Sequence, residues 1–101
     1  MAAHVLSGED VRTKLASLHP GWSGGTDKLA RSVEFADFPT AVQFVDRLAP
    51  RCEELNHHPD LAIHWRRVDI ELSTHSAGGV TDMDFALAQV IDEVAAGLPQ
   101  A

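Results

Sequence analysis

The sequence predicts an α+β domain in which helices pack on one face of an antiparallel sheet. Segments with a helical spacing of apolar residues alternate with pairs of short segments in which apolar and polar residues alternate. Their order is helix, hairpin, helix, hairpin, helix. The 101-residue chain suits one core, and 45% of it is apolar, an ordinary globular composition. We therefore assign residues 1–101 to a single domain.

The first expected helix begins at Ser7, whose hydroxyl is suited to accept from early backbone amides. Val11, Leu15 and Leu18 then recur at i, i+4 and i+7 and form one apolar stripe. The sequence His-Pro-Gly at 19–21 stops this pattern, so we expect the helix to end near Leu18.

A hairpin is expected over residues 22–35. Residues 23–27 are rich in Ser, Gly, Thr and Asp, which favour turns. Residues 29–35 then roughly alternate apolar with polar side chains, as a strand with one buried face does.

The second helix is expected to start at Asp37, because Pro39 is suited to a first helical turn. Its apolar residues follow helical spacing: Ala41, Phe44, Val45, Leu48, Cys52 and Leu55. Pro50 lies inside this pattern, where it removes an amide donor and crowds the carbonyl of Asp46. We therefore expect a kink or a break at Pro50.

The second hairpin and the last helix follow. Residues 61–65 read as extended, and residues 68–72 alternate cleanly, which predicts two antiparallel strands. Thr81, with Asp84 three residues later, is typical of a capping box at a helix start. This helix is expected to end near residues 97–99, a Gly-Leu-Pro sequence.

Charge and composition exclude several classes of function. A net charge of −7 with scattered Lys and Arg argues against direct nucleic-acid binding, and no apolar run is long enough to span a bilayer. Cys52 is the only cysteine, so it forms no internal disulfide, and we expect a small buried hydrophobe. Without a basic region and apolar run at the N-terminus, a cytoplasmic location is expected. The small core favours self-association, with the free sheet face as a contact.

Three of the six histidines lie where predicted elements meet. His57 and His58 follow the long helix, and His75 follows a strand. An imidazole titrates near pH ~6.5, so these side chains are suited to donate and accept protons at neutral pH. Pro59 pushes His58 toward an extended backbone, which predicts that the two adjacent rings point apart.

The remaining three histidines carry no such signal and are interpreted as ordinary solvated or locally bonded residues: His4, His19 and His64. Glu53 lies one helical turn before His57. It is interpreted either as a partner for a ring nitrogen of His57 or a substrate amide, or as an exposed acid without a role.

A longer pattern surrounds these histidines. It comprises Glu53-Glu54-Leu55-Asn56-His57-His58-Pro59, Trp65, Ser73-Thr74-His75-Ser76, Gly78-Gly79-Val80-Thr81 and Asp84. In order and spacing it closely resembles the pterin-4a-carbinolamine dehydratase family, and the resemblance extends from about Val11 to Val94. It implies a four-stranded antiparallel sheet with three helices on one face, assembled as a homodimer or homotetramer.

The resemblance also implies a reaction. Such enzymes remove water from a 4a-hydroxy-tetrahydropterin and give the quinonoid dihydropterin. Their substrate forms when an aromatic amino acid hydroxylase completes its reaction. This links the chain to tetrahydrobiopterin metabolism, with a pterin as its small-molecule partner and neither metal nor organic cofactor required. It implies His57 and His75 as the acid and base, with His58 binding or orienting the pterin and sharing proton transfer.

Four further residues are assigned to substrate binding by the same resemblance: Glu53, Asn56, Trp65 and Asp84. Two of them also have a structural interpretation that we favour: core packing for Trp65, and capping of the last helix for Asp84. Two positions depart from the family pattern. Asn56 stands where some members have a titratable Asp, and Pro50 replaces a more usual apolar residue, which predicts a shift of the histidine pair relative to His75.

Two alternatives to catalysis remain. Some proteins that resemble this family are assembly or dimerisation partners, so the chain is alternatively a non-catalytic protein-binding module. His57, His58 and His64 with Asp60 also contain metal-ligand types at short spacing. Adjacent extended residues point apart, so we expect no metal there.

Overall fold

A computed structural model describes residues 4–101, so the first three residues of the predicted domain lie outside the described part of the chain. This part contains three helices and a four-stranded antiparallel sheet, which confirms the predicted fold class. The elements are α1 (Gly8–Leu15), β1 (Ser23–Gly24), β2 (Leu29–Glu34), α2 (Phe38–Leu55), β3 (Asp60–His64), β4 (Arg67–Leu72) and α3 (Asp82–Ala96).

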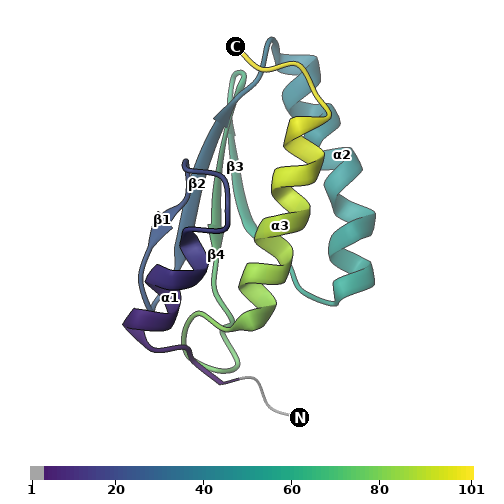
Figure 1. Ribbon diagram of the computed structural model, residues 1–101. Coiled ribbons are helices and arrows are strands. Elements are labelled where there is room, and N and C mark those ends of the chain that lie inside the picture. Colours follow the sequence, from purple (N-terminus) through teal and green to yellow (C-terminus); the bar gives the residue numbers. More distant parts are fainter. Residues whose placement is uncertain (1–3) are drawn as a thin grey trace.

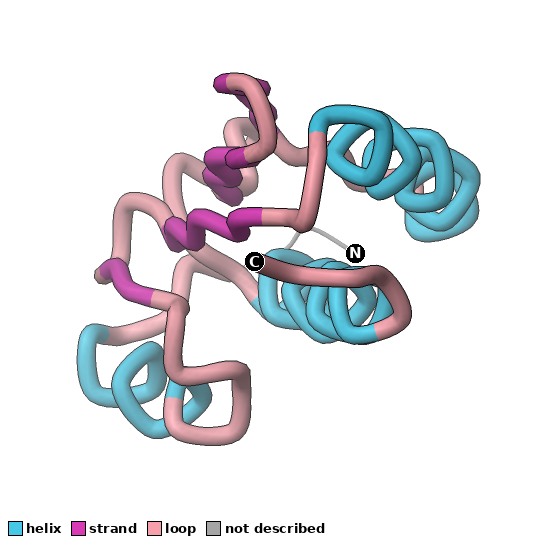
Figure 2. The backbone as a smooth tube through the Cα atoms, turned by 90° about the horizontal axis from the view of Figure 1, so that it is seen from above, coloured by secondary structure: helices cyan, strands magenta, loops and turns pink. Residues whose placement is uncertain are grey.

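The sheet has the strand order β1-β2-β4-β3, with the long strands β2 and β4 at its centre. Leu29 pairs with Leu72, and Val33 pairs with Val68, so the buried side chains of both strands share one face. The helices cover this face, with α1 beside the edge strand β1, and leave the opposite face open (Figures 1 and 2). The core therefore lies between the sheet and the pair α2 and α3.

Helix α2 packs one of its faces on this core. Its buried side chains recur at helical spacing, as the sequence predicts, and the ring of Phe44 lies 5.0 Å from that of Phe35. Among residues 4–101, no helix combines the length and the apolar character that crossing a bilayer demands. Fully enclosed side chains from several elements complete the core: Leu29, Leu48, Ile70, Leu72, Leu87 and Ile91.

Of the two outcomes expected at Pro50, a kink or a break, the break is wrong, because α2 is continuous from Phe38 to Leu55. Asp46, whose carbonyl would accept from an amide at position 50, is exposed, as is Pro50 itself. The missing hydrogen bond therefore falls on the solvent side, where water is able to take its place.

Helix α1 is shorter than its apolar stripe predicts. It ends at Leu15, and the chain continues in turns, with Leu18 N–H donating to the carbonyl of Leu15. Leu18 still packs against the core from this turn. The stripe therefore predicted which residues face inward but overestimated the helix by one turn.

A buried ion pair joins the sheet to α3. Arg31 lies on the buried face of β2, where the alternation alone would place an apolar residue. Its guanidinium donates to Oδ1 of Asp92, and the indole N–H of Trp22 donates to the same oxygen at 2.7 Å. Oδ2 accepts from the backbone N–H of His19 at 3.0 Å. Asp92 thus ties together α3, β2 and the turn after α1.

We expect Asp92→Asn to lower the free energy of unfolding by about 3 kcal/mol or more, because it leaves the charge of Arg31 buried and unpaired. Urea denaturation measures this loss. Glu93→Gln is the matched control, since Glu93 is exposed and its pair with Arg51 is worth less than about 1 kcal/mol. Equal losses in the two variants would contradict the assignment.

Candidate active site

A pocket of about 380 Å³ lies where the end of α2, the loop after β4 and the start of α3 meet. All three histidines singled out from the sequence line it. We call it the histidine pocket. Its lining residues are Asn56, His57, His58, Ser73, Thr74, His75, Ser76 and Met83.

The end of α2 sets the directions of the histidine pair. Asn56 adopts the left-handed conformation at φ 49° and ψ 42°, and the N–H of His57 then donates to the carbonyl of Cys52 at 3.2 Å. Asn tolerates this conformation better than most side chains do. After this turn His57 is buried and His58 is exposed, as expected for rings that point apart.

His57 belongs to a buried hydrogen-bond network centred on Asp84. Nε2 of His57 lies 2.6 Å from Oδ1 of Asp84. The other carboxylate oxygen accepts from the hydroxyl of Thr74 at 2.8 Å and from the backbone N–H of Thr81 at 2.9 Å. The carboxylate therefore orients the His57 ring, and the proton on Nε2 leaves Nδ1 as the ring nitrogen available for chemistry.

Asp84 also completes the predicted capping box with Thr81 at the start of α3, which confirms its capping role. Its side chain is fully buried and does not line the histidine pocket. Asp84 contacts His57 from outside the pocket lining, which fits a positioning role better than the predicted contact with substrate.

His58 pairs with Glu53 through Nε2, so Glu53 holds His58 and not His57. Both side chains are exposed. Glu53 lines a neighbouring, mostly apolar groove along α2, where His58 forms the border with the histidine pocket. Glu53 therefore does hold a histidine, as predicted, but a different one. Because α2 ends before His57, the turn at Asn56 brings His58 to the Glu53 carboxylate.

His75 lies on a tight loop between β4 and α3. Thr74 and Gly79 form a bridge across the base of this loop, and the N–H of Ala77 donates to the carbonyl of Thr74 at 2.9 Å. Gly78, at φ 84°, supplies the left-handed conformation that the turn requires. The His75 side chain is 84% exposed, and its Nε2 lies 4.0 Å from Oδ2 of Asp60.

Trp65 lies neither in the histidine pocket nor in the core, so the predicted core packing is wrong, and its assignment to substrate binding stays a prediction. It occupies the β3–β4 turn at φ 56°, is 69% exposed, and has the guanidinium of Arg66 4.6 Å from its ring centre. This turn lies at the opposite end of the sheet from the loop that carries His75 (Figure 1). A single turn after His64 reverses the chain before Trp65 is able to join the strand.

The residues considered as metal ligands, His57, His58 and His64 with Asp60, do not form one cluster. His64 lies 3.3 Å from Asp69, near the β3–β4 turn. Within residues 4–101, no three His, Cys, Asp or Glu side chains form a cluster suited to an ion. Cys52 is buried, and burial raises the pKa of its thiol, which suits the predicted role as a small hydrophobe.

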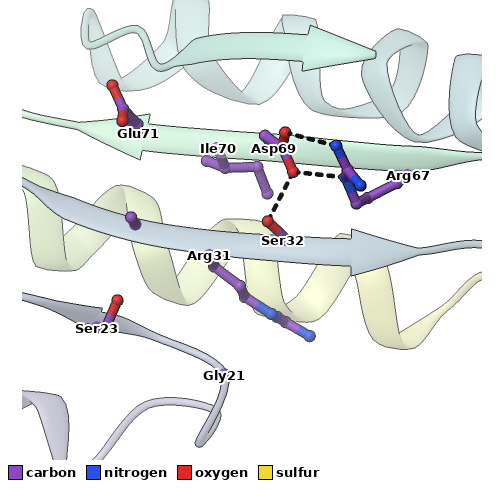
Figure 3. Close-up of a pocket in the computed structure, with 9 residues that line it drawn as sticks. Gly21, Ser23, Arg31, Ser32, Arg67, Asp69, Ile70 and Glu71 are labelled. Atoms are coloured by element: carbon purple, nitrogen blue, oxygen red, sulfur yellow. Dashed lines mark hydrogen bonds and ion pairs between the residues drawn. The ribbon is translucent and has the colours of Figure 1, made fainter. Parts of the chain in front are cut away.

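A larger pocket, of about 630 Å³, lies by the open face of the sheet (Figure 3). Its polar side chains largely satisfy one another: Asp69 accepts from the hydroxyl of Ser32 and from Arg67, and the bond from Ser32 lowers the pKa of Asp69. It contains no histidine. The histidine pocket is therefore the better candidate for proton chemistry.

Thr74 and Ser73 are site residues without an assigned role in the sequence-based interpretation. Thr74 donates to Asp84 across ten residues, and its hydroxyl lies 2.7 Å from that of Thr81. The capping-box pattern signals Thr81, but no local spacing signals Thr74, because its partner is reached only when the loop closes.

Comparisons with known proteins agree on one family. The sequence model for Pterin 4 alpha carbinolamine dehydratase matches residues 4–94. A protein of Nocardia farcinica named "Putative pterin-4-alpha-carbinolamine dehydratase" is 46% identical over 95 residues, covering 94% of this chain and 99% of that protein. A relative from Thermosynechococcus vestitus with the same name is 44% identical over 93 residues, covering 92% and 97%.

Two solved structures are similar. A crystal structure of a transcriptional coactivator/pterin dehydratase from Brucella melitensis has a TM-score of 0.84 and 35% identity, covering 89% of this chain and 97% of that one. A pterin dehydratase-like protein described as a RuBisCO assembly factor in the alpha-carboxysome has a TM-score of 0.60 and 25% identity, covering 73% and 86%.

We expect Asp84→Asn to lower the free energy of unfolding by about 1–3 kcal/mol, because the amide presents a donor to groups that already donate. The nitrogen-15 shifts of the His57 ring should change with it. Asp82→Asn is the matched control: Asp82 is exposed, and its pair with Lys14 is worth less than about 1 kcal/mol. An unchanged His57 ring in Asp84→Asn would contradict the network.

Proposed function

The chain belongs to the pterin 4 alpha carbinolamine dehydratase family, and we propose that it removes water from a 4a-hydroxy-tetrahydropterin by histidine acid and base catalysis. The observation that carries this proposal is that His57, His58 and His75 line one pocket. Its volume of about 380 Å³ is ample for a flat bicyclic ring.

The reaction is redox-neutral and needs two proton transfers. The lone pair of N5 forms the C4a=N5 double bond as the C4a–O bond breaks. The departing hydroxyl takes a proton and leaves as water, and N5 loses its proton to give the neutral quinonoid dihydropterin. A positioned acid and a positioned base each typically contribute about 10²–10⁴-fold to such a step.

We assign these transfers to His57 and His75. Asp84 holds one nitrogen of His57, so the ring has a defined direction and a carboxylate to stabilise the charge that it acquires on taking up a proton. His75 faces the same pocket from the exposed loop and is free to exchange protons with solvent. His58, held by Glu53, orients the pterin, and Asn56 supplies an amide to it.

Three further properties belong to the same proposal: tetrahydrobiopterin as the parent pterin, a cytoplasmic homodimer or homotetramer, and a hydroxylase that supplies the substrate. A second candidate, an assembly function without catalysis, is favoured by the similarity to the RuBisCO assembly factor. The intact set of three histidines in one pocket favours the dehydratase over this alternative.

The test is the decay of chemically generated 4a-carbinolamine, followed by absorbance with and without the purified protein. We expect His57→Ala and His75→Ala each to lower kcat by about 10²-fold or more, because each removes a proton-transfer group. His64→Ala is the matched control, since His64 is an exposed histidine near the far turn. We expect it to retain wild-type activity.

A decay rate that the wild-type protein does not raise above the uncatalysed rate would overturn the dehydratase proposal and favour the assembly function. Equal activity in His57→Ala, His75→Ala and His64→Ala would overturn the assignment of the histidines alone.

A further inference from the structure

A second pocket, of about 360 Å³, adjoins the histidine pocket. Ser73 and His75 line both, so His75 stands at the border between them. We call the second one the side pocket. Its other walls come from the turn before β2, the start of β3, the end of β4 and the loop after β4: Asp27, Lys28, Asp60, Glu71, Leu72 and Gly78.

The side pocket is polar and acidic. Nζ of Lys28 lies 2.9 Å from Oε2 of Glu71, and this hydrogen bond raises the pKa of Lys28, so the ammonium is already paired. Among residues 4–101, the only ion-pair partner within 4.0 Å of the Asp60 carboxylate is Nε2 of His75, at 4.0 Å. The hydroxyl of Ser73 donates to the carbonyl of Asp27. The side pocket thus offers more acceptors than free cations.

The geometry of the pterin ring connects the two pockets. The reacting atoms are C4a and N5, and C6 is bonded directly to N5. A substituent on C6 therefore leaves the ring within a few ångströms of any group that serves either reacting atom. With His75 at one of these atoms, the substituent emerges beside His75, where the side pocket opens.

We propose that the side pocket binds the C6 substituent of the substrate and selects neutral, hydroxylated chains over chains that carry phosphate or carboxylate. This inference rests on the proposed function. Hydroxyl groups donate well to carboxylates, and such bonds are stronger than those between neutral groups. An anionic chain would instead meet Asp60 and Glu71, with Lys28 already neutralised, and like charges at short range disfavour binding.

The test compares three 4a-hydroxy-tetrahydropterins: one with a dihydroxypropyl chain on C6, a phosphate ester of that chain, and one with only a methyl group. We expect kcat/KM of the wild-type protein to be about tenfold higher for the dihydroxypropyl compound than for the ester. Glu71→Gln should reduce this ratio to about threefold or less, because it removes one carboxylate and frees Lys28 to meet the phosphate. Glu34→Gln is the matched control, since it removes the same charge at the far end of β2 and should keep the wild-type ratio.

The outcomes separate the two proposals. If the wild-type protein dehydrates the methyl compound but shows no preference between the two chains, or if Glu71→Gln and Glu34→Gln keep the same ratio, the side-pocket proposal is overturned and the dehydratase stands. If no compound is dehydrated, the dehydratase proposal fails. Calorimetry then uses tetrahydropterins that lack the 4a hydroxyl but carry either the neutral chain or its phosphate ester. The ratio of their dissociation constants still shows which chain the side pocket prefers.

Discussion

The carboxylate of Asp84 is the contact on which the site depends. It is fully buried, and it joins three segments that are distant in sequence: the chain after α2 through His57, the loop base after β4 through Thr74, and the start of α3 through Thr81. A buried carboxylate is unfavourable unless donors surround it, so each of these donors must be in place for the core to close. The same bonds that cap a helix therefore orient the histidine.

This arrangement divides the pocket into a rigid side and a free side. His57 is held by a buried network, whereas His75 is carried by a short loop closed at Thr74 and Gly79 and keeps most of its surface in water. The division suits the proposed proton transfers, because one ring keeps a defined geometry and the other is in contact with solvent. The side pocket adjoins the histidine pocket on this free side, at His75.

Most of the fold was predictable from local patterns. Apolar periodicity found the three helices and the β3–β4 hairpin, and the capping signals at Ser7, Asp37 and Thr81 placed the helix starts. Two outcomes that local patterns did not give depend on distant chain segments or on the exact position of a turn. Arg31 is buried because Asp92 of α3 meets it, and Trp65 is exposed because it lies on the β3–β4 turn and not on a strand.

The candidate site shows the same limit. The three histidines were identifiable by type and position, and they do line one pocket. Their partners were not identifiable, since Glu53 was expected beside His57 and lies instead against His58. The direction of each ring depends on the left-handed turn at Asn56, which periodicity does not encode. Thr74 likewise has no partner within reach until the loop and α3 come together.

Asn56 carries a further implication for how this position varies. Its backbone requires a residue that accepts positive φ, which disfavours β-branched and bulky side chains, while its side chain lines the histidine pocket. Asn and Asp accept a positive φ about equally well. Exchange between them therefore adds or removes an ionisable carboxyl group without changing the path of the backbone. Substitution at position 56 can thus change the charge beside the histidine pocket without changing the backbone that forms it.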